Sequence, residues 1–277
     1  MATPPPPPPP PGGGAAPGSG GIPTRTFGEI FSAAFELYKE NFTKLIGLVA
    51  IVVIPLTLLQ YFLTNEVLVK DAVLDLESGT ITTTGWGEWW AVLGVSVLIG
   101  VIVQSILNGA IARAAAGTAI GESISTEAVY KFGLARLGPI IWISILVGLA
   151  TLGGFILLII PGIYIWVKLS VTVQALVVEN KRGTEAMSRS WNLTKGYGWQ
   201  VFGILIVTYI LAGIVTGIIT AIFGDNWFLA GLGASVAQII VLPFTALVLI
   251  VMYLDLRVRK ENLDVATLQN DMRSSAV

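Results

Sequence analysis

Residues 139–179 read PIIWISILVGLATLGGFILLIIPGIYIWVKLSVTVQALVVE, a stretch that is almost entirely apolar. A helix that crosses the roughly 30 Å hydrocarbon core of a membrane needs about 20 residues, so this stretch is long enough for two spans and too long for one. Pro161-Gly162 divides it, because proline cannot continue a helix and glycine accepts a positive φ. We therefore predict a tight hairpin of two membrane-spanning helices, at 139–160 and 162–179.

The composition of the whole chain is that of a membrane protein. Apolar residues make up 54% of 277 positions and charged residues only 12%, whereas soluble domains contain roughly 25% charged residues. The length rule that applies to the hairpin also predicts four further spans. They lie near 44–64, 90–112, 200–223 and 228–254.

Basic residues are concentrated on one side of these six spans. The sequence contains sixteen Lys and Arg residues, and fourteen of them fall in segments that share a side: Arg25, Lys39, Lys44, Arg113, Lys131, Arg136, Lys181, Arg182, Arg189, Lys195, Arg257, Arg259, Lys260 and Arg273. Cytoplasmic loops carry the excess of basic residues in membrane proteins. We therefore expect a multi-pass protein of the plasma membrane, in particular a bacterial inner membrane, with cytoplasmic N- and C-termini.

The opposite side carries acids and aromatic residues. The 65–89 loop has Lys70 as its one cation, and the turn at 224–226 has none. Aromatic side chains favour the headgroup layer of a membrane. Those at the predicted outer ends are Trp86, Trp89, Trp90, Trp227 and Tyr164.

Three of the inner segments contain a short amphipathic stretch ahead of a span. In the first, apolar residues from Phe27 to Phe42 follow the helical period, and Thr26 with Glu29 forms a capping box. The others begin at Thr126 and Thr184, each a predicted N-cap. This pattern favours a threefold repeat of interfacial helix and span pair, although basic amphipathic inner loops are common without one.

The fold class that follows is all-α, a polytopic membrane helix bundle with about six transmembrane helices and about three amphipathic interfacial helices. Residues 1–23 form a Pro/Gly-rich segment that cannot build a packed core, so we predict a disordered cytoplasmic tail there. Residues 24–264 form the six-span membrane domain. Residues 265–277 form a short polar C-terminal tail.

The chain contains neither Cys nor His. Their absence removes the common zinc ligands, the usual general base near neutral pH and the Ser-His arrangements of hydrolases. The interiors of the spans also lack the carboxylate pair that intramembrane aspartyl catalysis needs. We expect no enzymatic activity, no cofactor and no nucleic-acid partner.

Lys168 is the one cation in the interior of a predicted span. A charge in the middle of a bilayer is costly and is often functional. Its stem could extend outward past Tyr164 so that the ammonium reaches the interface. Alternatively, it could contact a polar side chain inside the bundle, namely Gln104, Asn108, Gln174 or Gln238.

Charged residues at the inner ends of the spans are the other candidates. Glu179, Arg189 and Arg257 could form a polar cluster that fixes the bundle or meets anionic headgroups, and they could equally be solvated helix ends. Asp255 with Arg259, and Glu185 with Arg189, have the i,i+4 spacing of helical ion pairs. Trp191 lies on the opposite face of its amphipathic stretch and is predicted to face the membrane.

Four motifs resemble a known family. They are LIIPGIYIWVK at 158–168, ALVVE at 175–179, EAMSRSWNLTKG at 185–196 and YLDLRVRKE at 253–261. Together they resemble the membrane domain of the glycerophosphoryl diester phosphodiesterase membrane-domain family, over roughly residues 26–264. The catalytic barrel that gives the family its name requires histidines that this chain lacks, so the resemblance implies a membrane module and no hydrolysis.

We therefore expect a non-enzymatic integral membrane module that interacts with membrane lipids, with a protein partner or with a second copy of itself. A transporter or channel subunit for a small solute is the alternative. It is favoured by Pro55 and Pro243 within spans and by Lys168, and it is disfavoured by the lack of acids in the span interiors.

Overall fold

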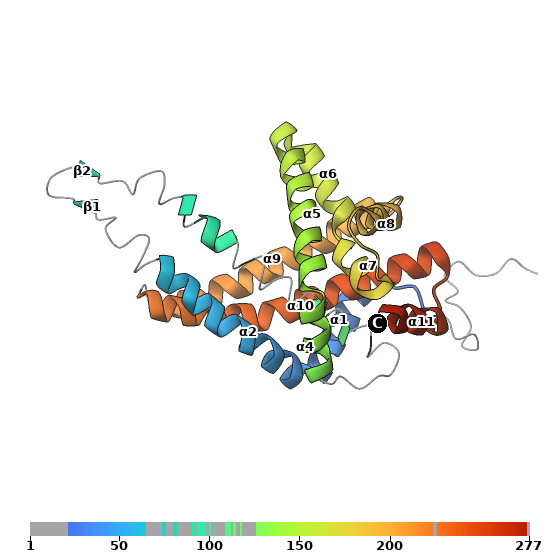
Figure 1. Cartoon of the computed structure of the whole chain (residues 1–277), viewed down its shortest axis with the longest axis horizontal. Coiled ribbons are helices and arrows are strands. Elements are labelled where there is room, and N and C mark those ends of the chain that lie inside the picture. The colour runs from blue at the N-terminus through green and yellow to red at the C-terminus, as the bar shows by residue number, and fades with distance from the viewer. Residues whose placement is uncertain are drawn as a thin grey trace, which may run out of the picture.

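The computed structural model describes residues 22–64, 74–75, 80–81, 90–91, 93–97, 100, 109–111, 113–114, 117, 126–223 and 226–275. The predicted all-α fold is confirmed (Figure 1). The helices are α1 (Phe27–Glu40), α2 (Phe42–Phe62), α4 (Thr126–Ala135), α5 (Leu137–Leu157), α6 (Ile159–Leu169), α7 (Thr172–Glu179), α8 (Thr184–Thr194), α9 (Gly198–Ile222), α10 (Trp227–Glu261) and α11 (Val265–Ser275). Two short strands, β1 (Leu74–Asp75) and β2 (Thr80–Ile81), pair antiparallel.

Five helical segments in the described part of the chain are long and apolar enough to cross a membrane. They are α2, α5, α6 together with α7, α9 and α10. The chain is therefore a multi-pass membrane protein. The predicted span at 90–112 lies largely outside the described residues, as do most of the N-terminal tail, Trp86 and Trp89.

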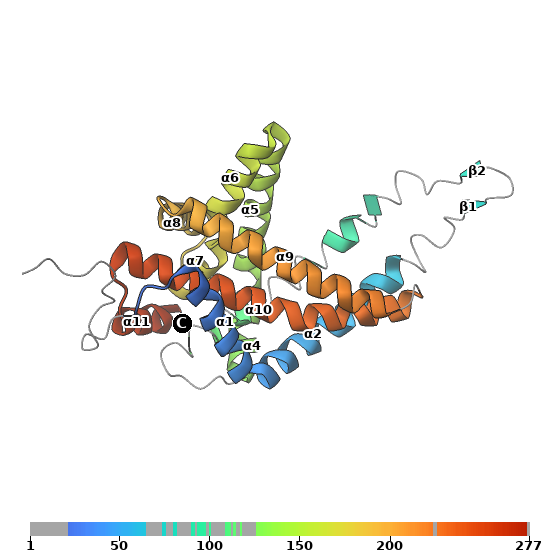
Figure 2. The same ribbon diagram turned by 180° about the vertical axis from the view of Figure 1, so that it is seen from behind.

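The central element of the bundle is α10. It packs along α2 and α9, and α1 lies across it (Figures 1 and 2). The approach of α2 is close, because a Cβ atom at Gly231 would lie 3.1 Å from Leu58 Cδ2 and 3.3 Å from Tyr61 Cβ. Gly213 and Gly217 on α9 have the spacing of a close helix contact, but a Cβ atom at either would meet nothing within 4 Å among the described residues.

The predicted hairpin is α5 followed by α6, but its break lies at Leu158 rather than at Pro161-Gly162. Leu158 is extended, with φ −165° and ψ 157°. Pro161 lies in the first turn of α6, where a missing N–H removes no intrahelical bond. Gly162 is helical and serves packing instead, since a Cβ there would lie 2.4 Å from the Phe155 ring.

The predicted span at 162–179 is also interrupted. Its helix breaks after Ser170, and α7 begins at Thr172. The hydroxyl of Ser190, on α8, donates to the Lys168 carbonyl at 2.7 Å and accepts the Val171 N–H at 3.3 Å. Because Ser190 satisfies both backbone groups, α8 stabilises the break.

The hairpin of α5 and α6 projects away from the α2, α9 and α10 bundle (Figures 1 and 2). Along α5 an apolar stripe at helical spacing is exposed, comprising Trp142, Ile145, Leu149, Leu152 and Ile156. In a membrane protein such a face is suited to contact with lipid chains or with a partner helix. The segments that connect the hairpin to the bundle are α7 and α8.

Each predicted interfacial stretch is a helix that precedes a long apolar one, as α1–α2, α4–α5 and α8–α9. The junction residues Asn41, Arg136 and Tyr197 have nearly the same conformation, with φ between −114° and −109° and ψ between 8° and 15°. The capping box of Thr26 and Glu29 is confirmed. Thr184 is not an N-cap, because Gly183 occupies that position.

The segment predicted as a polar C-terminal tail contains α11. It packs against α7, and its apolar side chains Leu268 and Met272 are buried in the core. Arg136, at the α4–α5 junction, donates to the Asn180 side chain at 2.7 Å and to the Ser275 carbonyl at the end of α11. The C-terminal helix is therefore part of the folded domain.

Candidate functional site

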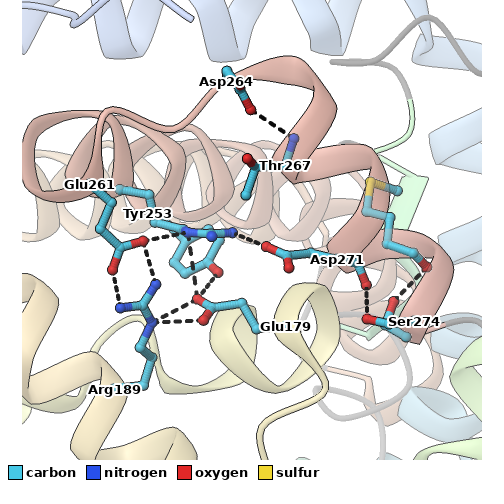
Figure 3. Close-up of polar contacts among 11 residues, drawn as sticks. Glu179, Arg189, Tyr253, Glu261, Asp264, Thr267, Asp271 and Ser274 are labelled. Carbon is cyan, nitrogen blue, oxygen red and sulfur yellow. Dashed lines mark hydrogen bonds and ion pairs between the residues drawn. The ribbon is translucent and has the colours of Figure 1, made fainter. Parts of the chain in front are cut away.

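Six side chains from four helices form a connected set, called here the ion-pair cluster. They are Glu179 of α7, Arg189 of α8, Tyr253, Arg257 and Glu261 of α10, and Asp271 of α11 (Figure 3). The structure thus brings together Glu179, Arg189 and Arg257, as the sequence hypothesis proposed.

The carboxylate of Glu179 lies at the centre of the ion-pair cluster. Arg189 Nε lies 2.9 Å from its Oε1 and 2.7 Å from its Oε2. The Tyr253 hydroxyl donates to Oε1 at 2.5 Å, and Arg257 Nε lies 3.7 Å away. The Glu179 side chain is only 8% exposed. A carboxylate this buried requires such partners, because removing a charge from water is costly.

The two arginines extend the ion-pair cluster to α10 and α11. Arg189 forms a bidentate pair with Glu261, in which Nη2 donates to Oε2 at 2.7 Å. Arg257 Nη1 donates to Asp271 at 2.8 Å. Burial disfavours the charged form of Arg189, but its hydrogen bonds with Glu261 and Glu179 outweigh that effect and raise the pKa of the guanidinium.

Three carboxylates surround two guanidinium groups in this arrangement, so the arginines are already neutralised. The Arg257 side chain is 5% exposed. This geometry favours a role in fixing four helices together over binding to anionic headgroups. No group of three or more acidic side chains in the described part of the chain is arranged to hold a metal ion.

Asp255 belongs to a neighbouring pair. Its Oδ2 accepts from Arg259 Nε at 2.7 Å, which confirms the predicted i,i+4 contact. Its Oδ1 accepts the backbone N–H of Arg25 at 2.7 Å, so Asp255 also holds the segment before α1. The other predicted pair does not form, because Glu185 is exposed and Arg189 turns to Glu179 and Glu261.

Lys168 is 5% exposed and lies beside two aromatic rings that contact each other. Its Nζ is 5.4 Å from the Tyr164 ring centroid and 5.9 Å from that of Trp191, and the two rings pack edge to face. Cation–π contacts of this kind partly compensate a desolvated ammonium. Gln174 Oε1 has no hydrogen-bond partner and the Gln238 amide donates to Thr57, so neither side chain accepts from Lys168, whereas Gln104 and Asn108 lie outside the described residues.

Tyr164 and Trp191 are therefore placed together, although the sequence predicted Tyr164 at an outer end and Trp191 on an inner helix facing the membrane. Trp191 is 38% exposed, and one side of its ring contacts α6. The reason is the break after Ser170, which brings α8 against the end of α6.

A pocket of about 770 Å³ lies beside Lys168, between α6 and the start of α9. Its wall is mainly apolar, and Lys168 is its one charged side chain among the lining residues. Ile160, Ile163 and Val167 line it from α6, and Tyr197, Trp199 and Phe202 line it at α9. No sequence pattern predicts this pocket, because it forms between segments that meet only in the tertiary structure.

Tyr253, Glu261, Asp271 and Ser190 were not among the candidates from sequence. Glu261 could have been found from its i,i+4 spacing with Arg257. Asp271 could be predicted only if α11 were recognised as a helix. Ser190 could be predicted only if the break after Ser170 were known. Tyr253 gives no sequence signal in an apolar helix.

Comparison of the chain with family models, with curated proteins and with solved structures found no match.

Proposed function

We propose that this chain is a non-enzymatic integral membrane module that binds membrane lipid. The observation that carries the proposal is the apolar pocket between α6 and α9, which lies next to helices long enough to cross a membrane. Concave, mainly apolar cavities of this size with a few polar groups are typical ligand sites. A lipid is the apolar ligand that a membrane supplies at the highest concentration.

The exposure of the pocket residues supports a ligand that arrives from the bilayer. Ile160, at one end of the pocket, is 80% exposed, and Trp199 is 87% exposed. Such apolar and aromatic surface is compatible with lipid contact on both sides of the pocket. A lipid chain could therefore enter along α6 without opening the packed α2, α9 and α10 bundle.

We propose that the protein lies in the plasma membrane, specifically a bacterial inner membrane. In the orientation that we propose, both termini are in the cytoplasm. The positive-inside distribution of Lys and Arg supports it. The helices α1, α8 and α11 would then lie on the cytoplasmic side together with the ion-pair cluster. A protein partner or a second copy could contact the exposed stripe of α5.

A transporter for a small solute is the competing function. A solute path through the bundle would need free polar groups, whereas several buried hydroxyls in the described spans bond within their own helices. Thr208 donates to the Ile204 carbonyl and Ser235 to the Gly231 carbonyl. Thr57 accepts from Gln238 at 3.3 Å. Among the described residues, Thr151 Oγ1 and Gln174 Oε1 are the buried side-chain polar atoms without a partner, and the pairing of the others favours lipid binding over transport.

The test is mild-detergent purification of the full chain followed by identification of co-isolated lipids and proteins by mass spectrometry. We expect lipid at about one molecule per chain after extensive washing. A lipid-free protein that drives solute flux when it is reconstituted in vesicles would support the transporter and contradict our proposal.

A further inference from the structure

The α6–α9 pocket has a polar end and an apolar end. Positions 160, 163, 164, 167 and 168 share one face of α6 and line the pocket along roughly 12 Å of helix, at about 1.5 Å per residue. Isoleucine side chains lie at the hairpin end, and Lys168 lies at the other. The pocket is therefore suited to an amphipathic molecule in one direction only.

The charge of the polar end is positive. The Lys168 ammonium forms no hydrogen bond or ion pair with the described residues, although Lys168 is 5% exposed and lines the pocket. A second cation, Lys260, has its Nζ 5.7 Å from the ring centroid of Tyr197, another lining residue. None of the described lining residues is acidic.

The first turn of α9 begins near the same end of the pocket, since Thr194, four residues before Gly198, donates to the Lys168 carbonyl at 3.4 Å. Its N-cap residue Tyr197 supplies no side-chain cap, and Gly198, Trp199 and Gln200 line the pocket. Their backbone N–H groups precede the first intrahelical donor, Val201 N, which bonds to the Tyr197 carbonyl. Unpaired N–H groups and the helix dipole favour an anion at this position.

We propose that the pocket binds one phospholipid with an anionic headgroup, whose phosphate lies between Lys168 and the first turn of α9 and whose acyl chain follows α6 toward Ile160. This inference rests on the proposed lipid-binding function and adds the headgroup class and the binding residues. The apolar wall selects a lipid over free phosphate, because a small anion would leave that wall unfilled.

The experiment is native mass spectrometry of the full chain in detergent, titrated with phosphatidylglycerol or with phosphatidylcholine. We expect phosphatidylglycerol to bind at least about tenfold more tightly, because both lipids carry the phosphate but the choline ammonium of phosphatidylcholine would be repelled by the nearby Lys168 ammonium. Lys168→Met should weaken phosphatidylglycerol binding by about the same factor, and Lys168→Arg should retain most of it. Lys44→Met removes an exposed lysine at the start of α2 and should change nothing.

A second variant tests the location of the site independently of the charge. A Cβ atom at Gly198 would meet no atom within 4 Å, and Gly198 lines the pocket, so we expect Gly198→Phe to fold with its ring filling part of the pocket. We expect it to weaken the binding of both lipids. Millimolar inorganic phosphate should not displace phosphatidylglycerol.

The outcomes separate the two proposals. Stoichiometric lipid that shows no headgroup preference, or that binds Lys168→Met and Gly198→Phe as tightly as the wild type, overturns this inference and leaves the lipid-binding function standing. Displacement by inorganic phosphate overturns the assignment to a lipid headgroup. A wild-type protein that retains neither lipid overturns the proposed function itself.

Discussion

The hydroxyl of Tyr253 on α10 donates a 2.5 Å hydrogen bond to the carboxylate of Glu179 on α7, although 74 residues separate them in the chain. Tyr253 is fully buried. The bond therefore links the central helix of the bundle directly to the segment that follows the α5–α6 hairpin. Arg189 and Arg257 approach the same carboxylate, so the attachment of the hairpin to the bundle depends on Glu179.

Replacing Glu179 should destabilise the fold strongly. Glu179→Ala leaves Arg189 and Arg257 without their shared carboxylate, and breaking a buried pair typically costs about 3–5 kcal/mol. Tyr253→Phe removes one hydrogen bond to a charged group and should cost less, about 1.5–3 kcal/mol. The free energy of unfolding can be measured by titrating the purified protein in mixed micelles with a denaturing detergent.

The matched control for this series is Glu185→Ala, because Glu185 is exposed and forms no pair with Arg189. It should change the free energy of unfolding by no more than about 0.5 kcal/mol. Equal effects of Glu179→Ala and Glu185→Ala would show that the ion-pair cluster does not hold the bundle together.

The sequence predicted those features that depend on local pattern. Four spans begin and end close to their predicted bounds, since the length of an apolar run and the bilayer thickness decide them. The capping box at Thr26 and the Asp255–Arg259 pair depend on spacing within one helix, and both formed. Glu179, Arg189 and Arg257 were brought together as proposed, because basic and acidic groups at the inner ends of spans have few other partners.

The features that were missed depend on contacts between distant segments. The break after Ser170 is stabilised by Ser190 from α8, and nothing in the apolar run around it indicates an interruption. The hairpin break at Leu158 was placed too late because proline was treated as a helix breaker, whereas it is tolerated in a first turn. The Lys168 pocket depends on the break after Ser170, so the pocket could not be predicted either.

The capping box should give the stability of α1 a pH dependence. Glu29 accepts the Thr26 N–H at 2.6 Å, and this backbone bond, with the Thr26 hydroxyl, lowers the pKa of the Glu29 carboxyl. Because its pKa is lower in the folded chain, the contribution is fully present above the ordinary pKa of glutamate and is lost as pH falls through the lowered value. The difference in unfolding midpoint between wild type and Glu29→Gln should therefore be largest near neutral pH and vanish in acid.

Glu36→Gln is the control for that comparison, since Glu36 is an exposed residue of α1 that takes no part in the capping box. Its difference from wild type should not follow the acid transition of Glu29→Gln. Identical pH profiles for the two variants would assign the effect to net charge instead.

The orientation can be tested by single cysteines, because the native chain has none. Asp75→Cys lies in the segment with few cations, and Ser188→Cys lies on an exposed position of α8 among basic residues. By the positive-inside rule, a membrane-impermeant maleimide should label the first variant on intact cells and the second only after permeabilisation. Labelling of position 75 only from the cytoplasm would reverse the proposed topology.

The stability of the α5–α6 hairpin should depend on Gly154 of α5 more than on its neighbour Gly153. A Cβ at Gly154 would lie 3.0 Å from Gly162 Cα and 2.9 Å from Ile165 Cδ1, so α5 and α6 could not keep their present separation. Forcing an extra methyl group into such a contact costs about 1–3 kcal/mol. A Cβ atom at Gly153 would meet no atom within 4 Å, so Gly153→Ala should gain up to about 1 kcal/mol of stability from helix propensity.

The free energy of unfolding of Gly162→Ala should lie between those of Gly153→Ala and Gly154→Ala. Its Cβ would meet the ring of Phe155, which is 43% exposed and can turn toward the surroundings, whereas the backbone opposite Gly154 cannot move aside. The free energies of unfolding in mixed micelles should therefore decrease in the order Gly153→Ala, wild type, Gly162→Ala, Gly154→Ala. If Gly154→Ala proved as stable as Gly153→Ala, the close packing of α5 against α6 would not be what holds the hairpin.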